Sequence, residues 1–287
     1  MKIVNKVVLA ETADTRIVRI DVEAAVIAAK AQPGQFIVLM VKQTGERIPL
    51  TIVDKNQNKG TITLIFQEIG YSTKLLGTLK QGDSLYSLVG PLGHPTLVKN
   101  YGKVFVVAGG VGIAEALPLV KSLKEGGCLI YSILGAKTKE LLILKDEIGK
   151  YCDKLYVSTD DGSLGEKGFV SDILERVLRK EKDFGLVYCV GPLPMMKVVS
   201  QITKPYNIKT TVCLNAIMLD ATGMCGGCRL IEAGKVKFCC VDGPEFDGHL
   251  VDFDELMQRQ DRFINEEKRS LGKFKDKGHK CRLDNTG

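Results

Sequence analysis

The chain has 287 residues, a formal net charge of +6 and 45% hydrophobic residues. This length suggests about two domains, each able to bury its own core. No lysine- and arginine-rich block alternates with aromatic residues, so nucleic acid is not expected as a partner. The longest apolar stretch, residues 104 to 120, contains Glu115, glycines and a proline, so a membrane span is not expected either.

The cysteine content points to a reducing compartment. Nine cysteines are an odd number, which does not suit a framework of disulfides. The apolar run near the N-terminus, from Val7 to Ala10, is too short for a signal peptide. A cytoplasmic location is therefore predicted.

The first 98 residues are typical of an antiparallel β-barrel domain. Short stretches rich in Val, Ile and Leu alternate with Gly, Pro and Asn turns, and one helix is expected to begin near Tyr71. The strands are expected at residues 2 to 9, 15 to 22, 35 to 41, 50 to 53, 61 to 67 and 84 to 89.

Residues 99 to 210 show the alternation of a parallel-sheet α/β domain. Strands are expected at residues 104 to 108, 128 to 134, 154 to 158 and 186 to 190. Helices are expected from residue 113 to 123 and at residues 140 to 148, 170 to 178 and 195 to 202.

The last part of the chain divides into a cysteine segment, residues 211 to 250, and a C-terminal helix with a polar tail, residues 251 to 287. Asp252 with Glu255 three residues later predicts a helix start with a capping box. The apolar face of that helix is expected to contain Phe253, Leu256, Met257, Gln260, Phe263 and Ile264. From about residue 273 the tail is expected to be frayed.

The cysteine segment has the spacing of a metal site. Cys225 and Cys228 lie on a glycine-rich turn, Cys239 and Cys240 follow, and Asp220 stands five residues before Cys225. A fourth cysteine at that place would complete a plant-type [2Fe–2S] array. A structural zinc with the same four ligands is also chemically allowed. Spacing alone does not decide between them.

Alternation along an extended segment selects one of the adjacent cysteines. Lys237 shares a face with Cys239 and should face water, whereas Val236, Phe238 and Cys240 should face inward. The predicted ligand set is therefore Asp220, Cys225, Cys228 and Cys240.

Several glycine-rich turns are placed where they could hold nucleotide phosphates. Gly109, Gly110, Val111, Gly112 and Ile113 follow a strand and open a helix, which is the context of a phosphate-binding turn. Two other segments follow strands of the same sheet, where ligands bind. They contain Thr159, Asp160, Asp161, Gly191 and Pro192. For residues 159 to 161 a polar turn is the better interpretation.

The barrel offers two further phosphate-suitable sites. Arg47 provides a positive charge near Thr51, and Gly70, Ser72 and Thr73 open a helix. Each alone is also typical of an ordinary turn or cap.

The order of these parts resembles the ferredoxin reductase superfamily. More narrowly, it is similar to the electron-transfer subunits of class B dihydroorotate dehydrogenase. The segments 214 to 228 and 237 to 246 resemble above all the alpha-subunit branch of NADH-dependent reduced ferredoxin:NADP oxidoreductase, also known as sulfide dehydrogenase. The resemblance covers about residues 1 to 265. In that branch the first cluster ligand is an aspartate, as at Asp220, whereas the dihydroorotate branch has cysteine there. The family pattern also selects Cys240 over Cys239.

The resemblance implies FAD in the barrel, NAD(H) on the α/β domain and a [2Fe–2S] cluster near the flavin. It implies a larger flavin and iron–sulfur partner, where electron bifurcation with ferredoxin and NADP(H) is expected. Flavin contacts carried over by position are Pro49, Leu50, Thr51, Ile65, Phe66, Gln67, Gly70, Ser72 and Thr73. Arg47 lies one position away from the family's arginine, next to Ile48.

No side chain is predicted as a catalytic residue, because the cofactors carry the chemistry. NAD(H) is favoured over NADP(H), since only Lys137 follows the second strand of the α/β domain. Two alternatives stay open: the dihydroorotate dehydrogenase subunit, and more remotely a nucleotide-sensing protein with a structural zinc.

Overall fold

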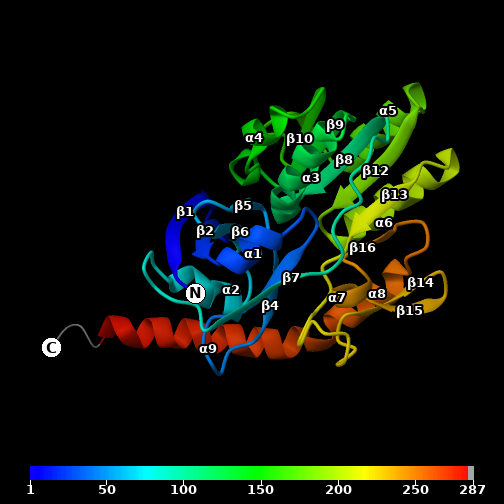
Figure 1. Cartoon of the computed structure of the whole chain (residues 1–287). Helices are drawn as coiled ribbons and strands as arrows, with labels where there is room; N and C mark the ends of the chain where they lie inside the picture. The colour runs from blue at the N-terminus through cyan, green and yellow to red at the C-terminus, as the bar shows by residue number, and fades with distance from the viewer. Residues whose placement is uncertain (284–287) are drawn as a thin grey trace.

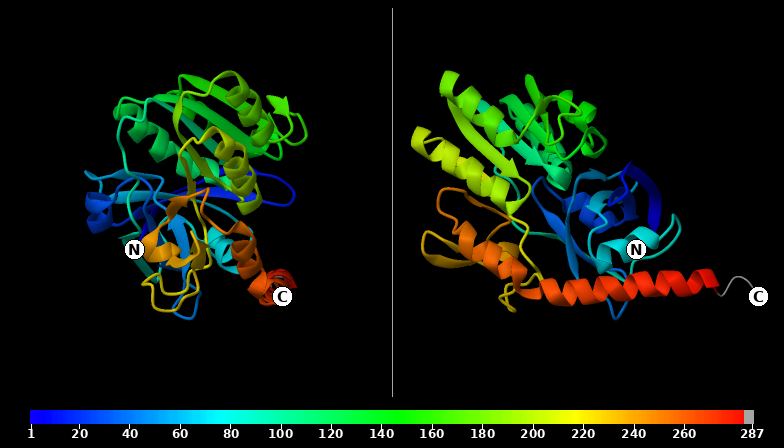
Figure 2. Two further views of the ribbon diagram at one scale, coloured as in Figure 1. Left: turned by 90° about the vertical axis from the view of Figure 1, so that its right-hand side faces the viewer. Right: turned by 180° about the vertical axis from the view of Figure 1, so that it is seen from behind.

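The computed structural model describes residues 1–283, which form two lobes and a C-terminal segment beside both. The N-terminal strands make one lobe and the parallel sheet the other, while the last helix runs along the lower side of the N-terminal lobe (Figure 1, Figure 2). No helix among residues 1–283 is long and apolar enough to cross a membrane.

The N-terminal lobe consists of two antiparallel sheets. The four-stranded sheet has the order β1 (Ile3–Glu11), β2 (Arg16–Glu23), β6 (Thr61–Gln67) and β5 (Asp54–Asn56). The three-stranded sheet has the order β4 (Ile48–Thr51), β3 (Phe36–Met40) and β7 (Ser87–Leu92). Helices α1 (Ala25–Lys30) and α2 (Tyr71–Thr78) complete the lobe.

One apolar core lies between these two sheets. Val18 of β2, Leu64 of β6 and Ile37 of β3 are fully buried in it. The antiparallel architecture is as predicted, but seven strands form two sheets where six strands of one barrel were expected. Strand β5 was missed because its three residues are polar and exposed, which leaves no alternation to detect.

The second lobe is built on a seven-stranded sheet with the order β11-β10-β9-β8-β12-β13-β16. Its strands are β8 (Lys103–Gly109), β9 (Leu129–Ala136), β10 (Lys154–Thr159), β11 (Glu166–Lys167), β12 (Phe184–Val190), β13 (Thr210–Cys213) and β16 (Glu245–Asp247). All neighbours are parallel except β13 and β16, which pair antiparallel. The parallel sheet is as predicted.

Helices cover this sheet and connect its strands. They are η1 (Gly110–Gly112), α3 (Ile113–Glu125), η2 (Lys139–Leu141), α4 (Lys145–Gly149), α5 (Val170–Lys180), α6 (Leu193–Thr203) and η3 (Lys204–Tyr206). The helix expected at residues 140 to 148 is interrupted, because Leu142 and Ile143 are both buried and Leu144 has a φ of 55°. Consecutive buried side chains do not fit one face of a helix.

The C-terminal segment contains a hairpin and three α-helices. Its elements are β14 (Arg229–Glu232), β15 (Lys235–Phe238), α7 (Cys239–Asp242), α8 (Phe253–Gln260), η4 (Asp261–Phe263) and α9 (Ile264–Leu283). The Asp252 side chain accepts a hydrogen bond from the Glu255 amide at 3.0 Å, which confirms the predicted helix cap. In a full capping box the Glu255 side chain would accept a hydrogen bond from the Asp252 amide. That amide instead donates to the Ile231 carbonyl oxygen.

Two expectations about this helix were wrong. Phe263 and Ile264 are 42% and 43% exposed, because η4 breaks the helical face that the sequence pattern extended. The tail expected to fray from residue 273 is helical as far as Leu283. Helix α9 packs on α2, where the rings of Tyr71 and Phe274 meet edge to face at 5.7 Å.

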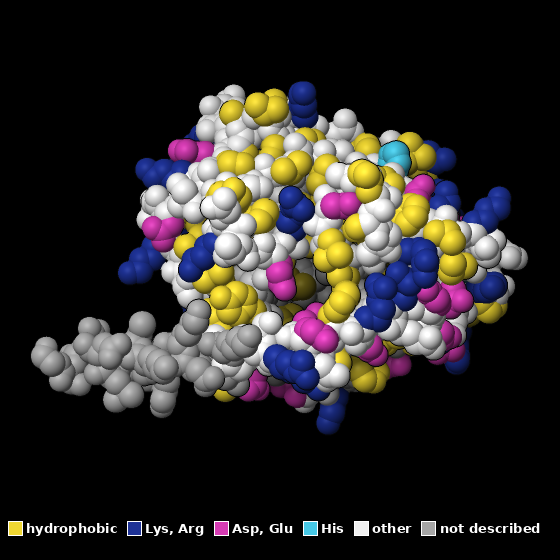
Figure 3. Space-filling view, turned by 90° about the horizontal axis from the view of Figure 1, so that it is seen from below, with side chains coloured by type: hydrophobic (Ala, Val, Ile, Leu, Met, Phe, Trp, Pro, Cys, Tyr) yellow, Lys and Arg dark blue, Asp and Glu magenta, His cyan; other side chains and the backbone are white. Residues whose placement is uncertain are grey.

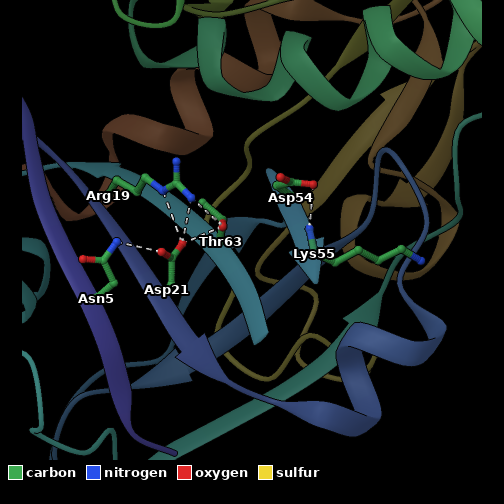
Figure 4. A network of polar contacts seen from close by, with 6 residues as sticks. All are labelled: Asn5, Arg19, Asp21, Asp54, Lys55 and Thr63. Atoms are coloured by element: carbon green, nitrogen blue, oxygen red, sulfur yellow. Dashed lines mark hydrogen bonds and ion pairs between the residues drawn. The ribbon is translucent and has the colours of Figure 1, made fainter. Parts of the chain in front are cut away.

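A polar network ties the first sheet together (Figure 4). The Asp21 carboxylate accepts hydrogen bonds from Asn5 on β1, Thr63 on β6 and Arg19 on its own strand, at 2.9, 2.6 and 3.2 Å. Burial opposes ionisation of Asp21, but the bonds from Thr63, Asn5 and Arg19 outweigh it and hold its pKa below the ordinary 3.8. The network thus stabilises the ionised form.

We expect Asp21→Ala to lower the free energy of unfolding by about 1–3 kcal/mol at pH 7, because it leaves three donors without their acceptor. Since the folded pKa is depressed, the difference should be complete above pH 3.8 and fade as the pH falls through the folded value. Urea denaturation at a series of pH values measures it. Asp54→Ala, which removes an exposed carboxylate bonded to the Lys55 amide, is the control and should change stability by less than about 0.5 kcal/mol.

Candidate functional site

The turn predicted to bind phosphate lies at the carboxyl edge of the parallel sheet. Gly109 ends β8, Thr159 ends β10 and Val190 ends β12, and these parallel strands finish on the same side. Helix η1, which follows Gly109, packs against β6 of the N-terminal lobe. The structure thus brings the turn of one lobe next to a strand predicted to contact flavin in the other.

Close backbone approach explains two glycines of this edge. A Cβ at Gly112 would lie 2.9 Å from the Val190 carbonyl oxygen and 3.0 Å from Gly191 Cα. A Cβ at Gly191 would lie 3.0 Å from the Gly109 carbonyl oxygen. A Cβ at Gly110, in contrast, would meet nothing within 4 Å. The two turns are therefore packed tightly together, and the one residue of η1 that borders open space leaves room for a ligand.

The segment after β10 is largely occupied with its own turn. Thr159 is buried, and its hydroxyl donates to the Leu164 carbonyl oxygen at 2.9 Å. The Asp161 carboxylate accepts from the Ser163 amide and hydroxyl at 2.9 and 2.7 Å. Asp160 is exposed. These bonds favour the polar-turn interpretation for Thr159 and Asp161.

The predicted flavin contacts line two strands of the N-terminal lobe. Pro49, Leu50 and Thr51 form most of β4 and are half-buried. On β6, Ile65 and Phe66 are buried in the core, which leaves Gln67 as the more accessible of the three. Arg47, in the loop before β4, is exposed.

The start of helix α2 is arranged around Thr73. Its hydroxyl oxygen accepts hydrogen bonds from the Ile69 and Gly70 amides, each at 3.1 Å. The Ser72 hydroxyl donates to Glu46 at 2.8 Å. A Cβ at Gly70 would meet nothing within 4 Å, so open space lies in front of this helix end. Room for an anion is present, although Thr73 itself serves as part of the cap.

The four predicted cluster ligands form two pairs, with Asp220, Cys225 and Cys228 in the loop before β14 and Cys240 in α7. The Cys225 amide and thiol both approach the Asp220 carboxylate, at 3.1 and 3.3 Å. Cys228 Sγ and Cys240 Sγ are 3.2 Å apart, which is far longer than a disulfide bond. Asp220 and Cys225 are exposed or half-exposed, whereas Cys228 and Cys240 are buried. One pair therefore lies at the surface and the other inside.

Backbone amides point at the sulfur atoms of this region. The Gly227 amide donates to Cys225 Sγ and the Cys240 amide to Cys228 Sγ, both at 3.4 Å. Amide donors of this kind stabilise thiolates and the sulfides of a cluster. Among the residues described, no group of three or more His, Cys, Asp and Glu side chains is arranged around one metal ion. Two pairs of donors suit a cluster with two irons, so the residues present fit the group.

The alternation argument for Cys239 and Cys240 was wrong in part. Cys239 is fully buried and donates to the Leu214 carbonyl oxygen at 3.1 Å, and Val236 is 52% exposed. Strand β15 ends at Phe238 and helix α7 begins at Cys239, so the two cysteines do not alternate across an extended segment. Cys240 is nevertheless the cysteine that lies beside Cys228.

Two arginines that the sequence did not single out hold the cluster turn. Arg259 Nη2 donates to the Gly226 carbonyl oxygen and Arg262 Nη2 to the Gly227 carbonyl oxygen, both at 3.3 Å. These carbonyls belong to the two residues between Cys225 and Cys228. Arginines on an amphipathic helix are usually solvated, so the sequence carried no signal for this contact.

Glu115 was also missed as a site residue. Its carboxylate lies beneath surrounding protein next to Cys213 and Thr51, and burial raises its pKa to about 7 despite hydrogen bonds with these two residues. The available signal was one acidic residue inside a long apolar stretch. That signal served only to exclude a membrane span.

Comparisons with known proteins agree with this arrangement. A family model described as "Iron-sulfur cluster binding domain of dihydroorotate dehydrogenase B" matches residues 215–252, and "Oxidoreductase NAD-binding domain" matches residues 106–201. A cytochrome P450 reductase from Amycolatopsis shares the fold at a TM-score of 0.60 and 18% identity, covering 72% of this chain and 65% of its own. The fold is ferredoxin-reductase-like.

Closer relatives narrow the assignment. A Thermotoga maritima protein named "Dihydroorotate dehydrogenase B (NAD(+)), electron transfer subunit homolog" is 44% identical over 248 residues, which is 86% of this chain and 87% of its own. The chain therefore belongs to the family of dihydroorotate dehydrogenase B electron transfer subunits. It is an NAD(H)-dependent oxidoreductase subunit with FAD, an iron–sulfur cluster and NAD(H) as cofactors. The zinc alternative is set aside.

One solved structure is similar over almost the whole chain. It was reported for flavin-based electron bifurcation by NADH-dependent reduced ferredoxin-NADP oxidoreductase. The chains are 42% identical at a TM-score of 0.88, covering 95% of this chain and 97% of that one. A Clostridium beijerinckii protein of undescribed function is 46% identical and covers 91% of both chains.

We expect Gly112→Ala to weaken NADH binding, because the new Cβ would push the turn after β8 away from Val190 and Gly191. A misplaced phosphate cradle should cost about tenfold or more in affinity, while FAD content stays unchanged. Titration of NADH against the oxidised protein measures the effect. Gly149→Ala, whose Cβ would make an ordinary 3.4 Å contact with Leu155, is the control. Equal affinities for both variants would contradict the packing argument.

We expect Arg259→Met to loosen the turn between Cys225 and Cys228, since it removes the donor to the Gly226 carbonyl oxygen while keeping the apolar stem. The cluster should be lost faster on incubation with a chelator, and its electron paramagnetic resonance lines should broaden. Arg269→Met, at an exposed position of α9, is the matched control. Identical loss rates in the two variants would show that the arginine does not hold the turn.

Proposed function

We propose that this chain is the small subunit of an electron-bifurcating NADH-dependent reduced ferredoxin:NADP oxidoreductase. In this role it passes electrons between NAD(H), FAD and a [2Fe–2S] cluster and a larger flavin and iron–sulfur subunit. Ferredoxin and NADP(H) would react on that partner. The proposal rests on the similarity to the bifurcating enzyme's structure and on the aspartate beside the cluster cysteines.

The three cofactors have separate places on the chain. We propose that Pro49, Leu50, Thr51 and Gln67 border the flavin, with the open end of α2 and Arg47 near its phosphates. The tight turn at Gly112, with Gly191 beside it, would hold the pyrophosphate of NAD(H). When bound, FAD would exchange electron pairs with NAD(H) and single electrons with the cluster.

Asp220 is the observation that favours the bifurcating enzyme over the dihydroorotate dehydrogenase subunit. Its carboxylate lies 3.3 Å from Cys225 Sγ, while Cys228 and Cys240 form a second, buried pair. We propose that Asp220 and Cys225 bind one iron and that Cys228 and Cys240 bind the other. The exposed iron would then carry the oxygen ligand.

The surface around the exposed pair suits a protein partner. Leu219, Met224 and Val241 are 52%, 88% and 41% exposed and lie within one or two residues of cluster ligands. From below, hydrophobic side chains are exposed among charged ones around a hollow in the surface (Figure 3). Exposed apolar side chains next to a redox centre support docking of the larger subunit there.

We also infer the division into functional units and the location of the protein. The boundaries at about residues 98, 210 and 250 separate the FAD, NAD and cluster-binding units, although β16 joins the cluster segment to the NAD sheet. A cytoplasmic location is supported by the free thiols Cys128, Cys152, Cys189 and Cys213.

We expect Asp220→Cys to keep the cluster but change its spectrum, because a thiolate replaces a harder oxygen ligand on one iron. Electron paramagnetic resonance of the reduced protein and its midpoint potential measure the change. Asp254→Asn, an exposed carboxylate paired with Lys197, is the control. Spectra and potential identical to those of the unmodified protein would remove Asp220 from the ligand set and return the dihydroorotate dehydrogenase subunit as the better assignment.

A further inference from the structure

Glu115 is a buried acid at the junction of all three cofactor-binding parts. It lies in the first turn of α3, directly after the phosphate-binding turn of the NAD lobe. Its carboxylate lies close to the side chain of Thr51, which belongs to β4 of the FAD lobe. It also accepts from Cys213 Sγ at 3.5 Å, and Cys213 is the last residue of β13, near the start of the cysteine segment.

Burial also raises the pKa of the groups around Glu115. Burial raises the pKa of Cys213 and of Tyr188 well above their ordinary values, and it raises the pKa of Cys239 to about 12. On β16, Glu245 accepts a hydrogen bond from the Tyr188 hydroxyl at 2.8 Å and another from Thr96, and burial raises its pKa as well.

Glu115 itself titrates close to neutrality. Burial raises its pKa to about 7, so both protonation states are accessible under ordinary conditions. The carboxylate is covered, but the residue as a whole keeps part of its surface accessible. A carboxylate of this kind can take up a proton and release it to solvent.

The proposed electron path creates a need for such a group. A hydride from NADH consists of two electrons and one proton, whereas an iron–sulfur cluster carries electrons singly and no proton. For each NADH oxidised, two electrons leave through the cluster and one proton has to leave the flavin by another route. A base next to the flavin can receive that proton and pass it to solvent, which balances charge and atoms.

We propose that Glu115 is this base, and that the Thr51 hydroxyl relays the proton from the flavin to the Glu115 carboxylate. A hydroxyl can accept one hydrogen bond while donating another, so Thr51 can stand between the two groups. In the reverse direction of electron flow Glu115 supplies the proton. This inference rests on the proposed function, because it requires flavin beside Thr51.

Glu115→Gln tests the inference in the full-length protein with its cofactors. Glutamine keeps the size and the hydrogen bonds to Thr51 and Cys213 but cannot take up a proton at neutral pH. Flavin reduction by NADH should stay within about twofold, because a hydride brings its own proton. Reoxidation of the NADH-reduced protein by ferricyanide should slow by about 100-fold and lose its pH dependence near 7. Glu125→Gln, at an exposed position of the same helix, is the control and should behave as the unmodified protein.

A second measurement does not depend on turnover. Redox-difference infrared spectra of the unmodified protein should contain a protonated-carboxyl band that is absent in Glu115→Gln and retained in Glu125→Gln. The inference is overturned if the band persists in Glu115→Gln or if reoxidation keeps its pH profile. It is also overturned if both half-reactions slow equally with a shifted flavin spectrum, because that result shows a structural role.

The failure of the proposed function would look different. If the chain were instead the dihydroorotate dehydrogenase subunit, NADH would still reduce the flavin, and Asp220→Cys would leave the cluster spectrum unchanged. If the chain passed no electrons from NADH, the flavin of the unmodified protein would not be reduced at all. Normal NADH reduction in the unmodified protein together with an unaltered Glu115→Gln variant would reject the role of Glu115 alone.

Discussion

A single apolar core joins the parts of the chain that hold different cofactors. Phe36 and Val38 come from the N-terminal lobe, Phe105 and Val107 from the parallel sheet, and Cys228 and Cys240 from the cluster segment, and all are buried in the same cluster of side chains. Protein interiors are close-packed, so this shared core fixes the lobes relative to each other. Electron transfer between separate cofactors depends on such fixed distances.

The cluster turn is stabilised from two directions. Backbone amides of Gly227 in the turn and of Cys240 in α7 donate toward the sulfur atoms, whereas Arg259 of α8 and Arg262 of η4 donate toward the Gly226 and Gly227 carbonyl oxygens of the turn. The glycines allow the backbone to expose both sides, since Gly223 and Gly226 have φ values of 82° and 67°. The exposed pair, Asp220 and Cys225, is thus held by backbone geometry and does not depend on burial.

Much of the fold could be predicted from the sequence because its signals are local. The strand of residues 103 to 109 is continuously apolar, and the turn after it is rich in glycine, which together specify a parallel strand and its ligand turn. The sequence signals failed where tertiary packing determines the local structure. Strand β5 is polar throughout, and the apolar residues Leu142 and Ile143 are buried without helical geometry.

The candidate site shows the same division between local sequence signals and contacts that depend on tertiary packing. The spacing of Asp220, Cys225 and Cys228 is visible in the sequence, because these residues share one turn. Which of Cys239 and Cys240 lies beside Cys228 depends on where α7 begins. The environment of Glu115 depends on Thr51 and Cys213, which are 64 and 98 positions away in the chain. Contacts between such distant residues carry no periodicity in the sequence.

An anaerobic titration of the purified full-length protein with NADH tests the central claim most directly, with the flavin followed by absorbance and the cluster by electron paramagnetic resonance. The account predicts that NADH bleaches the flavin absorbance and produces the signal of a reduced [2Fe–2S] cluster in the same sample. Two results would contradict an electron path from NADH through FAD to the cluster. In the first, NADH bleaches the flavin but produces no cluster signal, although dithionite does produce one. In the second, the purified protein contains no bound flavin.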